Sequence, residues 1–294
     1  MIGYLFVLIS ALSGAGKGYL GKTISAKTNS YKASVFVNLI RMLLCIAISV
    51  ITEVIERGSV RFQLDGAAVL YGTMTGIFMS VFVVSWLLCI QRDAFMLVSV
   101  AQMFGVIVTL LLSFVVFREN VTPKQVLGIA FLTAAVLCML SYSAKIKGNM
   151  TVTSILLLLL CGVSSGLLDF SQKLYTAFSQ SSVSALNLLT YASGAVFLTL
   201  CFTGSKPQTD LDCKALLKET FVALFLMAIC LFANSYFKAF ATKFLTAAQI
   251  YPVYQSITLI LRSSMSALCF KEKLTVRSVV GIILAFMALV FINM

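Results

Sequence analysis

The chain has 294 residues, of which 60% are hydrophobic and 11% are charged, and its mean hydropathy is +1.02. A soluble domain carries about 25% charged residues, so this composition excludes an ordinary soluble globule. The formal net charge is +12, but the basic residues are scattered over short connectors and form no patch with exposed aromatics, so we expect no nucleic-acid partner. The partner that the composition predicts is the lipid bilayer.

Apolar stretches of about 20 residues, each long enough to cross the hydrocarbon core of a membrane, recur along the whole chain. They predict an all-α integral membrane protein with ten transmembrane helices. The first stretch has no basic segment before it and carries Lys17 and Lys22 after its apolar residues, so we expect a helix and not a cleaved signal peptide. The ten spans are expected at roughly 3–23, 34–53, 66–90, 94–116, 124–143, 153–172, 183–203, 219–241, 246–270 and 274–293.

Side chains that commonly bind metals or catalyse reactions are scarce. Histidine is absent, no two of the eight cysteines are spaced as CxxC, and the ten acidic residues lie mostly near predicted helix ends. The sequence therefore predicts no metal and no other cofactor, and it argues against an enzyme.

One short motif instead indicates a nucleotide-binding enzyme. GKGYLGKT, from Gly16 to Thr23, satisfies the phosphate-binding pattern GxxxxGK[ST]. We favour helix packing as its explanation, because Gly14 and Gly18 are spaced by four, as are two glycines in the sixth predicted helix, and this spacing lets helices approach closely. A nucleotide-binding membrane enzyme is the alternative.

An internal repeat covers most of the chain. FRENVTPKQVLGI, from Phe117 to Ile129, and FKEKLTVRSVVGI, from Phe270 to Ile282, share six of thirteen residues, and the first helices of the two halves align at almost the same offset. The repeat units are 1–147 and 148–294, with five predicted spans each. Because five is odd, the second copy enters the membrane from the opposite side. Such inverted repeats are characteristic of secondary transporters.

These residues resemble the drug/metabolite transporter superfamily, and within it the EamA-like proteins. The resemblance rests on YFKAFATKFLTAAQIYPVYQ, from Tyr236 to Gln255, and on the two loops that contain Glu119 and Glu272. Each loop has threonine three residues after the acidic residue and glycine nine residues after it. The first half departs from the pattern at Ser99, where the second half has Pro252. The resemblance implies ten helices, active transport of small solutes, often efflux, and both termini in the cytoplasm.

The connector charges give a different orientation. Connectors after odd-numbered predicted helices hold more Lys and Arg than those after even-numbered helices. Basic residues accumulate on the cytoplasmic side, so this excess places both termini outside. The two arguments agree that the termini share one side of the membrane.

Charged residues inside a membrane are costly and are functional candidates by default. Three basic residues, Lys17, Arg41 and Arg262, lie well inside predicted spans. The alternative for each is that a long side chain reaches back to the membrane surface.

Matching polar stripes run along the first and sixth predicted helices. Ser13 and Lys17 share one helical face, and the repeat places Asp169 at the position equivalent to Lys17. If both stripes line one cavity, Lys17 binds a carboxylate or phosphate and Asp169 binds an ammonium or hydroxyl, or serves as a protonatable group for coupling to an ion gradient. A buried pair between Lys17 and Asp169, or a local pair between Asp169 and Lys173, is the alternative.

Further polar residues lie within predicted helices, and some of them serve only to join neighbouring helices. The complete candidate site is Lys17, Arg41, Asp169, Arg262, Ser13, Gln102, Asn234, Gln249 and Tyr254. The sequence thus predicts a multi-pass secondary active transporter of a small polar or zwitterionic metabolite, such as an amino acid or an organic anion, in the plasma membrane. A homodimer is a further expectation, and a non-transporting membrane sensor or subunit is a second alternative.

Overall fold

The computed structural model describes residues 2–28, 30–58, 62–92, 95–118, 122–147, 151–205, 212–271 and 275–293. These residues form α-helices joined by short connectors, and no β-strand occurs among them. The helices are α1 (Ile2–Ser25), α2 (Tyr31–Arg57), α3 (Gly66–Arg92), α4 (Phe95–Ala101), α5 (Phe104–Phe117), α6 (Pro123–Lys147), α7 (Val152–Phe178), α8 (Val183–Gly204), α9 (Cys213–Ala241), α10 (Ala247–Leu268) and α11 (Val276–Asn293).

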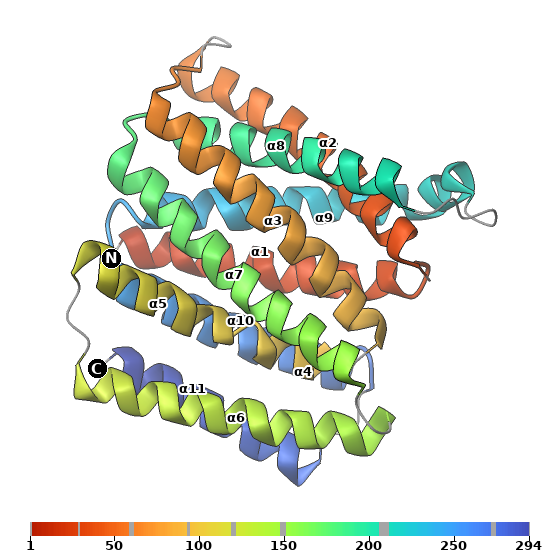
Figure 1. Ribbon diagram of the computed structural model, residues 1–294, viewed down its shortest axis with the longest axis vertical. Helices are drawn as coiled ribbons and strands as arrows, with labels where there is room; N and C mark the ends of the chain where they lie inside the picture. The colour runs from red at the N-terminus through yellow and green to blue at the C-terminus, as the bar shows by residue number, and fades with distance from the viewer. Residues whose placement is uncertain are drawn as a thin grey trace.

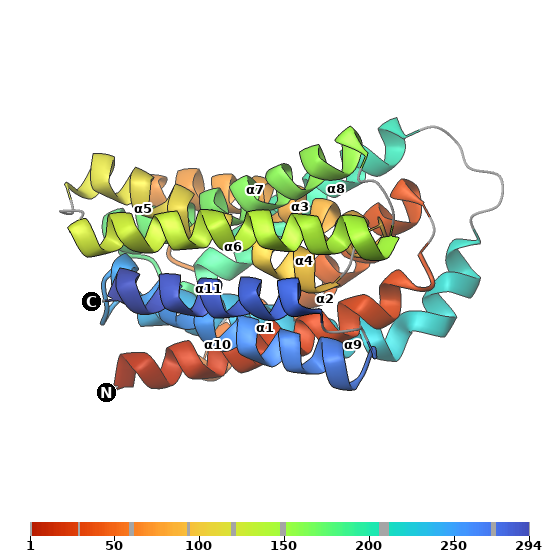
Figure 2. The ribbon, with the colours of Figure 1, turned by 90° about the horizontal axis from the view of Figure 1, so that it is seen from below.

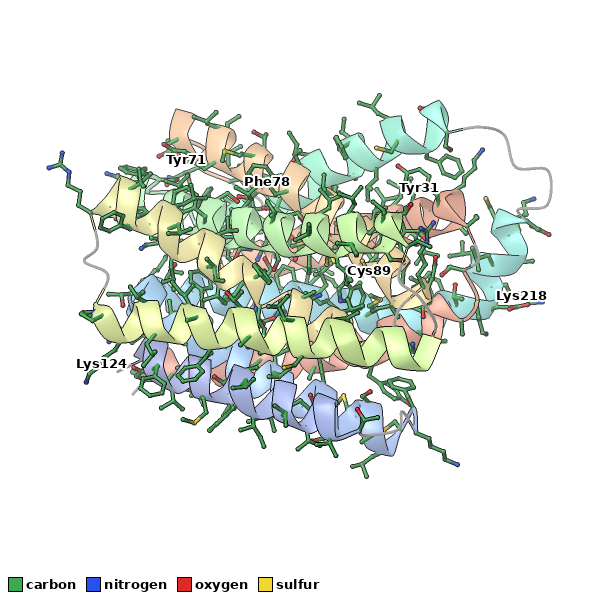
Figure 3. All side chains as sticks on the ribbon, turned by 60° about the horizontal axis from the view of Figure 1, so that its bottom comes forward. Tyr31, Tyr71, Phe78, Cys89, Lys124 and Lys218 are labelled. Atoms are coloured by element: carbon green, nitrogen blue, oxygen red, sulfur yellow. The ribbon has the colours of Figure 1, made fainter. Side chains whose placement is uncertain are left out.

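Several of these helices have the length and composition of membrane spans. Six segments of the described residues are long and apolar enough to cross a membrane, namely Tyr31–Glu56, Gly66–Arg92, Leu97–Phe117, Val152–Phe178, Val183–Gly204 and Cys213–Ala241. Large apolar side chains such as Leu156 and Val222 are exposed on their outer faces. Lys124 and Lys218 lie at opposite ends of the bundle (Figure 3). Such an apolar surface between charged ends is what surrounding lipid requires.

Polar residues before the helices explain where several of them begin. Ser30, Thr151 and Ser182 each accept a hydrogen bond from the backbone NH three residues later and so cap α2, α7 and α8. The repeat signature contributes two more helix starts, because Thr122 and Thr275 directly precede α6 and α11. The acidic residues of these two loops, at positions 119 and 272, lie outside the described residues.

The fourth predicted span, 94–116, corresponds to an apolar segment of membrane length, Leu97–Phe117, but its helix is interrupted. α4 ends at Ala101 and α5 begins at Phe104. Between them the NH of Gly105 donates to the carbonyl of Gln102 at 2.9 Å, a bond over three residues that is tighter than the α-helical spacing. Hydropathy gave no sign of this break, because the segment is apolar on both sides of Gln102.

The two halves of the sequence interleave. α1 packs against α9 and α10, while α7 packs against α3 and α5. The pair α2 and α8 forms one edge of the molecule, and the pair α6 and α11 forms the opposite edge (Figure 1). The most extensive contacts all join a helix of residues 1–147 to a helix of residues 151–293. A Cβ atom on Gly166 would lie 2.5 Å from the carbonyl oxygen of Gly105, so glycine lets α5 and α7 touch backbone to backbone.

Both chain ends lie on the same side of the bundle, at the left of Figures 1 and 2. We call this side the terminal end and the other side the opposite end. α3 begins and α7 finishes at the terminal end, whereas α1 finishes and α2 begins at the opposite end (Figure 1).

Candidate functional site

A polar cavity lies between the two halves, among α1, α3, α7, α9, α10 and the junction of α4 with α5. The centre of a water molecule can occupy only about 20 Å³ of it, which is room for about one water. The lining residues are Lys17, Met79, Phe82, Gln102, Ser165, Leu168, Asp169, Gln172, Asn234, Ser235, Lys238, Tyr254, Gln255 and Arg262.

Asp169 of α7 and Lys238 of α9 form a buried ion pair in this cavity. The ammonium of Lys238 donates to Oδ1 of Asp169, and the side chains are only 6% and 3% exposed. Lys238 also lies over the ring of Tyr254, with its Nζ 5.1 Å from the ring centroid. The backbone carbonyl of Asp169 accepts from the hydroxyl of Tyr251 at 2.7 Å. The only carboxylate that lines the described cavity therefore already has a cationic partner.

Arg262 of α10 is held by neutral groups. One guanidinium nitrogen, Nη1, donates to the side-chain oxygen of Gln102, and the other, Nη2, donates to the carbonyl of Gly14 at 3.1 Å. The Nε of Arg262 and the Nε2 of Gln102 are buried and have no hydrogen-bond partner among the described residues. A Cβ on Gly14 would lie 2.7 Å from the hydroxyl of Tyr254 and 2.9 Å from Nδ2 of Asn234, so a larger residue here would displace these two side chains.

Lys17 of α1 is 4% exposed and lines the same cavity. Its Nζ lies 5.4 Å from the centroid of the Phe82 ring, and no acceptor among the described residues hydrogen-bonds to it. The charges of Arg262, Arg41 and Lys238 repel Lys17, and that of Asp169 attracts it. Lys17 is thus a buried cation without an ion-pair partner in the described structure.

Neutral side chains fix the helices around these charges. Asn234 of α9 donates to the backbone carbonyl of Ser10 at 2.8 Å and to the hydroxyl of Tyr254 at 2.9 Å, which joins α9 to α1 and α10. Gln172 of α7 donates to Ser235 of α9 at 2.9 Å, but its own Oε1 is buried without a hydrogen-bond partner among the described residues.

The cavity brings together most of the predicted site residues, from helices far apart in the sequence. Six of them line it, namely Lys17, Asp169, Arg262, Gln102, Asn234 and Tyr254. The alternative, a direct pair between Lys17 and Asp169, is not found, because Asp169 pairs with Lys238. Lys173, the other expected partner, has its ammonium 4.2 Å from the centroid of the Phe117 ring.

Three predicted residues do not line the cavity. Gln249 is exposed and accepts a hydrogen bond from the NH of Thr246, so it belongs to the cap of α10. Ser13 donates to the carbonyl of Ile9 in its own helix at 2.9 Å. Arg41 is fully buried on α2, where its Nη1 contacts the sulfur of Met227 at 3.4 Å.

Sequence reasoning missed three polar lining residues, Gln172, Ser235 and Lys238, as members of the site. A signal for Lys238 was present, because it follows Asn234 by four residues and therefore shares its helical face.

The motif from Gly16 to Thr23 lies inside α1 and is not an exposed loop. A Cβ on Gly18 would lie 3.1 Å from the Nε of Arg262, and one on Gly21 would lie 2.3 Å from the Trp86 ring. These glycines let neighbouring side chains pack against α1. A phosphate-binding loop instead directs free backbone NH groups at its ligand, and a helix interior has none to offer.

A second, larger pocket lies where α1 and α3 finish and α2 and α7 begin, at the opposite end of the bundle. Its volume is about 610 Å³, and Tyr31, Gln91 and Arg92 are among its lining residues. Tyr31 and Cys89 of the adjoining helices lie on that side of the molecule (Figure 3).

Comparison with known proteins gives one family match and a match in fold. Residues 1–141 match the model of the EamA-like transporter family, within the drug/metabolite transporter superfamily. The match covers just under half of the chain, so over these residues the chain is similar to the EamA-like transporter family. A solved crystal structure of a protein that is 12% identical has a similar fold, with a TM-score of 0.67, and the match covers 96% of this chain and 95% of that one. No curated protein sequence matches the chain.

The family match confirms the resemblance predicted from the sequence. Together with the apolar helices, the match indicates a multi-pass membrane protein. The structural match extends over nearly the whole chain, so the fold of the second half is shared as well.

Proposed function

We propose that this EamA-like protein is a secondary active transporter that moves a small polar metabolite by alternating access. The observation that carries the proposal is the central cavity, which is lined by buried charged side chains from both halves of the sequence. Ionisable residues at membrane depth are expensive and mark substrate or ion pathways. The cavity has room for about one water, so a metabolite enters only when the helices around it move apart.

The proposal includes ten spans arranged as two inverted repeats, 1–147 and 148–294. α4 and α5 together make one apolar segment of membrane length, and α1 and α10 have 24 and 22 residues. The packing supports the repeat. The second-half equivalents of α1, α3 and α5 are α7, α9 and α10, and the contacts of α1 with α9 and α10 correspond to those of α7 with α3 and α5. The broken fourth span beside the cavity resembles the discontinuous helices at transporter binding sites.

Contacts between the halves support closure at the terminal end. Asp65, which directly precedes α3, accepts hydrogen bonds from the hydroxyl of Ser179 at 2.8 Å and the NH of Gln180 at 3.2 Å, in the turn after α7. Near the end of α2, Glu53 accepts from Ser184 of α8 at 2.5 Å. With the larger pocket at the opposite end, these contacts favour access from that side. The plasma membrane, a driving ion gradient and a homodimer remain predictions.

Flux in proteoliposomes tests this function. Purified protein in vesicles loaded with a mixture of labelled amino acids, organic acids, sugar phosphates and amines should release at least one solute faster than protein-free vesicles. Loss of that flux in the Asn234→Leu variant, which removes the junction of α1, α9 and α10, would tie transport to the cavity. Absence of flux for every solute class would favour the sensor or subunit alternative. Saturable ATP binding that Lys22→Ala abolishes would instead revive the nucleotide enzyme.

A further inference from the structure

The charges of the central cavity do not balance, and their excess is positive. Among the described residues, three cations line it, Lys17, Lys238 and Arg262, against the single carboxylate of Asp169. Lys238 and Asp169 neutralise each other. Lys17 and Arg262 therefore remain as two buried positive charges, and the hydrogen-bond acceptors of Arg262 are a neutral amide and a backbone carbonyl.

Unused donors accompany this excess. Nε of Arg262 and Nε2 of Gln102 are buried without a partner among the described residues. The side chain of Lys17 is also buried, and its ammonium lies over the Phe82 ring with no hydrogen bond to a described residue. A buried donor that is left unpaired costs free energy, more so when it is charged. Since all three belong to one cavity, a single ligand rich in acceptor oxygens satisfies them together.

Arg41 increases the positive field. It is fully buried on α2, and its Nε and Nη2 have no hydrogen-bond partner among the described residues. Although it does not line the cavity, its charge acts on Lys17 and repels it. A cationic ligand in the cavity would add to this repulsion, whereas an anionic ligand would relieve it.

We propose that the substrate of this site is a small organic anion with two negative charges, such as a dicarboxylate or a phosphate monoester, bound by Lys17 and Arg262. This inference rests on the transport function proposed above and narrows its substrate class. Arg262 presents a planar guanidinium suited to an oxyanion, and Lys17 supplies a point charge from α1. A zwitterion is disfavoured, because the carboxylate that would bind its ammonium is already paired with Lys238.

Thermal unfolding of the purified full chain tests the charge of the ligand. Succinate and glycerol 3-phosphate represent the proposed class, alanine represents zwitterions, and choline represents cations. We expect the two dianions to raise the melting temperature by binding the folded state, and the other two to have smaller effects at equal concentration. A larger shift with choline or alanine, or none with either anion at millimolar concentration, would overturn the substrate class.

The Lys17→Met variant tests whether Lys17 binds the anion or belongs to a structural ion pair. The two readouts are its ligand-free melting temperature and its response to the anions. The substitution removes a buried charge that has no counter-charge, so the ligand-free variant should melt higher than the parent. The anion concentration needed for half of the shift should rise about ten- to a hundredfold, as expected for loss of a charged hydrogen bond. Lys17→Arg should retain most of the response.

Lys22→Met is the matched control, because Lys22 lies on the same helix outside the cavity lining. It should keep the parent's response to both anions. If Lys17→Met lowers the ligand-free melting temperature, or keeps the parent's anion response, the proposed role of Lys17 is wrong. Flux of choline or alanine with no anion flux would refute the substrate class and leave the transport function standing.

Discussion

The Asp169–Lys238 pair is the residue-level feature on which the electrostatics of the cavity depend. Its members come from α7 and α9, and both are almost fully buried. Two charges removed from water remain tolerable only while each has the other, and removal of one partner leaves an uncompensated charge. The pair therefore sets which charges in the cavity are available to a substrate.

A double-mutant cycle on this pair measures its role. Asp169→Leu and Lys238→Met alone should each destabilise the protein by about 3 to 5 kcal/mol, because each leaves one unpaired buried charge. The double variant should recover most of that loss, measured as melting temperature in detergent. If the double variant melts no higher than the less stable single variant, the two residues do not form the pair described here.

Sequence reasoning found the charged residues of the site better than it found their partners. Lys17, Asp169 and Arg262 stood out because charges are rare in apolar segments. The pairing of these charges depends on how each helix is rotated and on contacts between distant segments. A hydropathy pattern contains no information on either. Lys17 and Asp169 were expected at equivalent positions facing one cavity, and both line it. The partner of Asp169 is nevertheless Lys238, from a helix that the repeat does not pair with α7.

At the level of elements, the contact between α3 and the turn after α7 closes the terminal end. Asp65 accepts hydrogen bonds from the NH of Ala68 in its own helix and from Ser179 and Ser181 across the interface. The hydroxyl of Ser179 is the main cause that lowers the pKa of Asp65 below its ordinary value. The contact is therefore strongest when Asp65 is ionised.

The sign of the pH dependence follows from that shift. Because the folded pKa lies below the unfolded value of about 3.9, the stabilisation is complete above that pH and disappears as the pH falls through the folded pKa. Asp65→Asn should thus lower the melting temperature at neutral pH, and its difference from the parent should shrink in acid.

Asp212→Asn is the control for this measurement, because Asp212 caps only its own helix, α9. It should leave the melting temperature nearly unchanged at neutral pH, since asparagine caps helices about as well as aspartate. An Asp65→Asn variant that melts like the parent across the pH range would show that this contact does not hold the terminal end together.

The elements themselves were largely predictable from the sequence, because long apolar stretches form helices in a membrane. Nine of the predicted spans each correspond to a single described helix. The break between α4 and α5 was not predictable in this way. It places Gln102 beside Arg262, and that contact exists only in the folded chain.

At the scale of the whole molecule, both chain ends lie at one end of the bundle (Figures 1 and 2). Reporters fused to the two ends should therefore report the same side of the membrane. Side-specific labelling in intact cells also decides the orientation, because family resemblance expects the cytoplasm and the connector charges expect the exterior. Reporters on opposite sides would refute the proposed ten spans.

The interleaving of the two halves has a consequence for how the protein is made. The most extensive packing surfaces of α1, α2, α3 and α6 are covered by helices that come later in the sequence. During synthesis the first half therefore enters the membrane before its partners exist, and its polar stripe around Lys17 meets lipid or the insertion machinery instead of α9 and α10. The helices of the first half gain their main packing partners only when the second half has been translated. Premature termination after α6 would therefore leave a fragment exposed to membrane proteases.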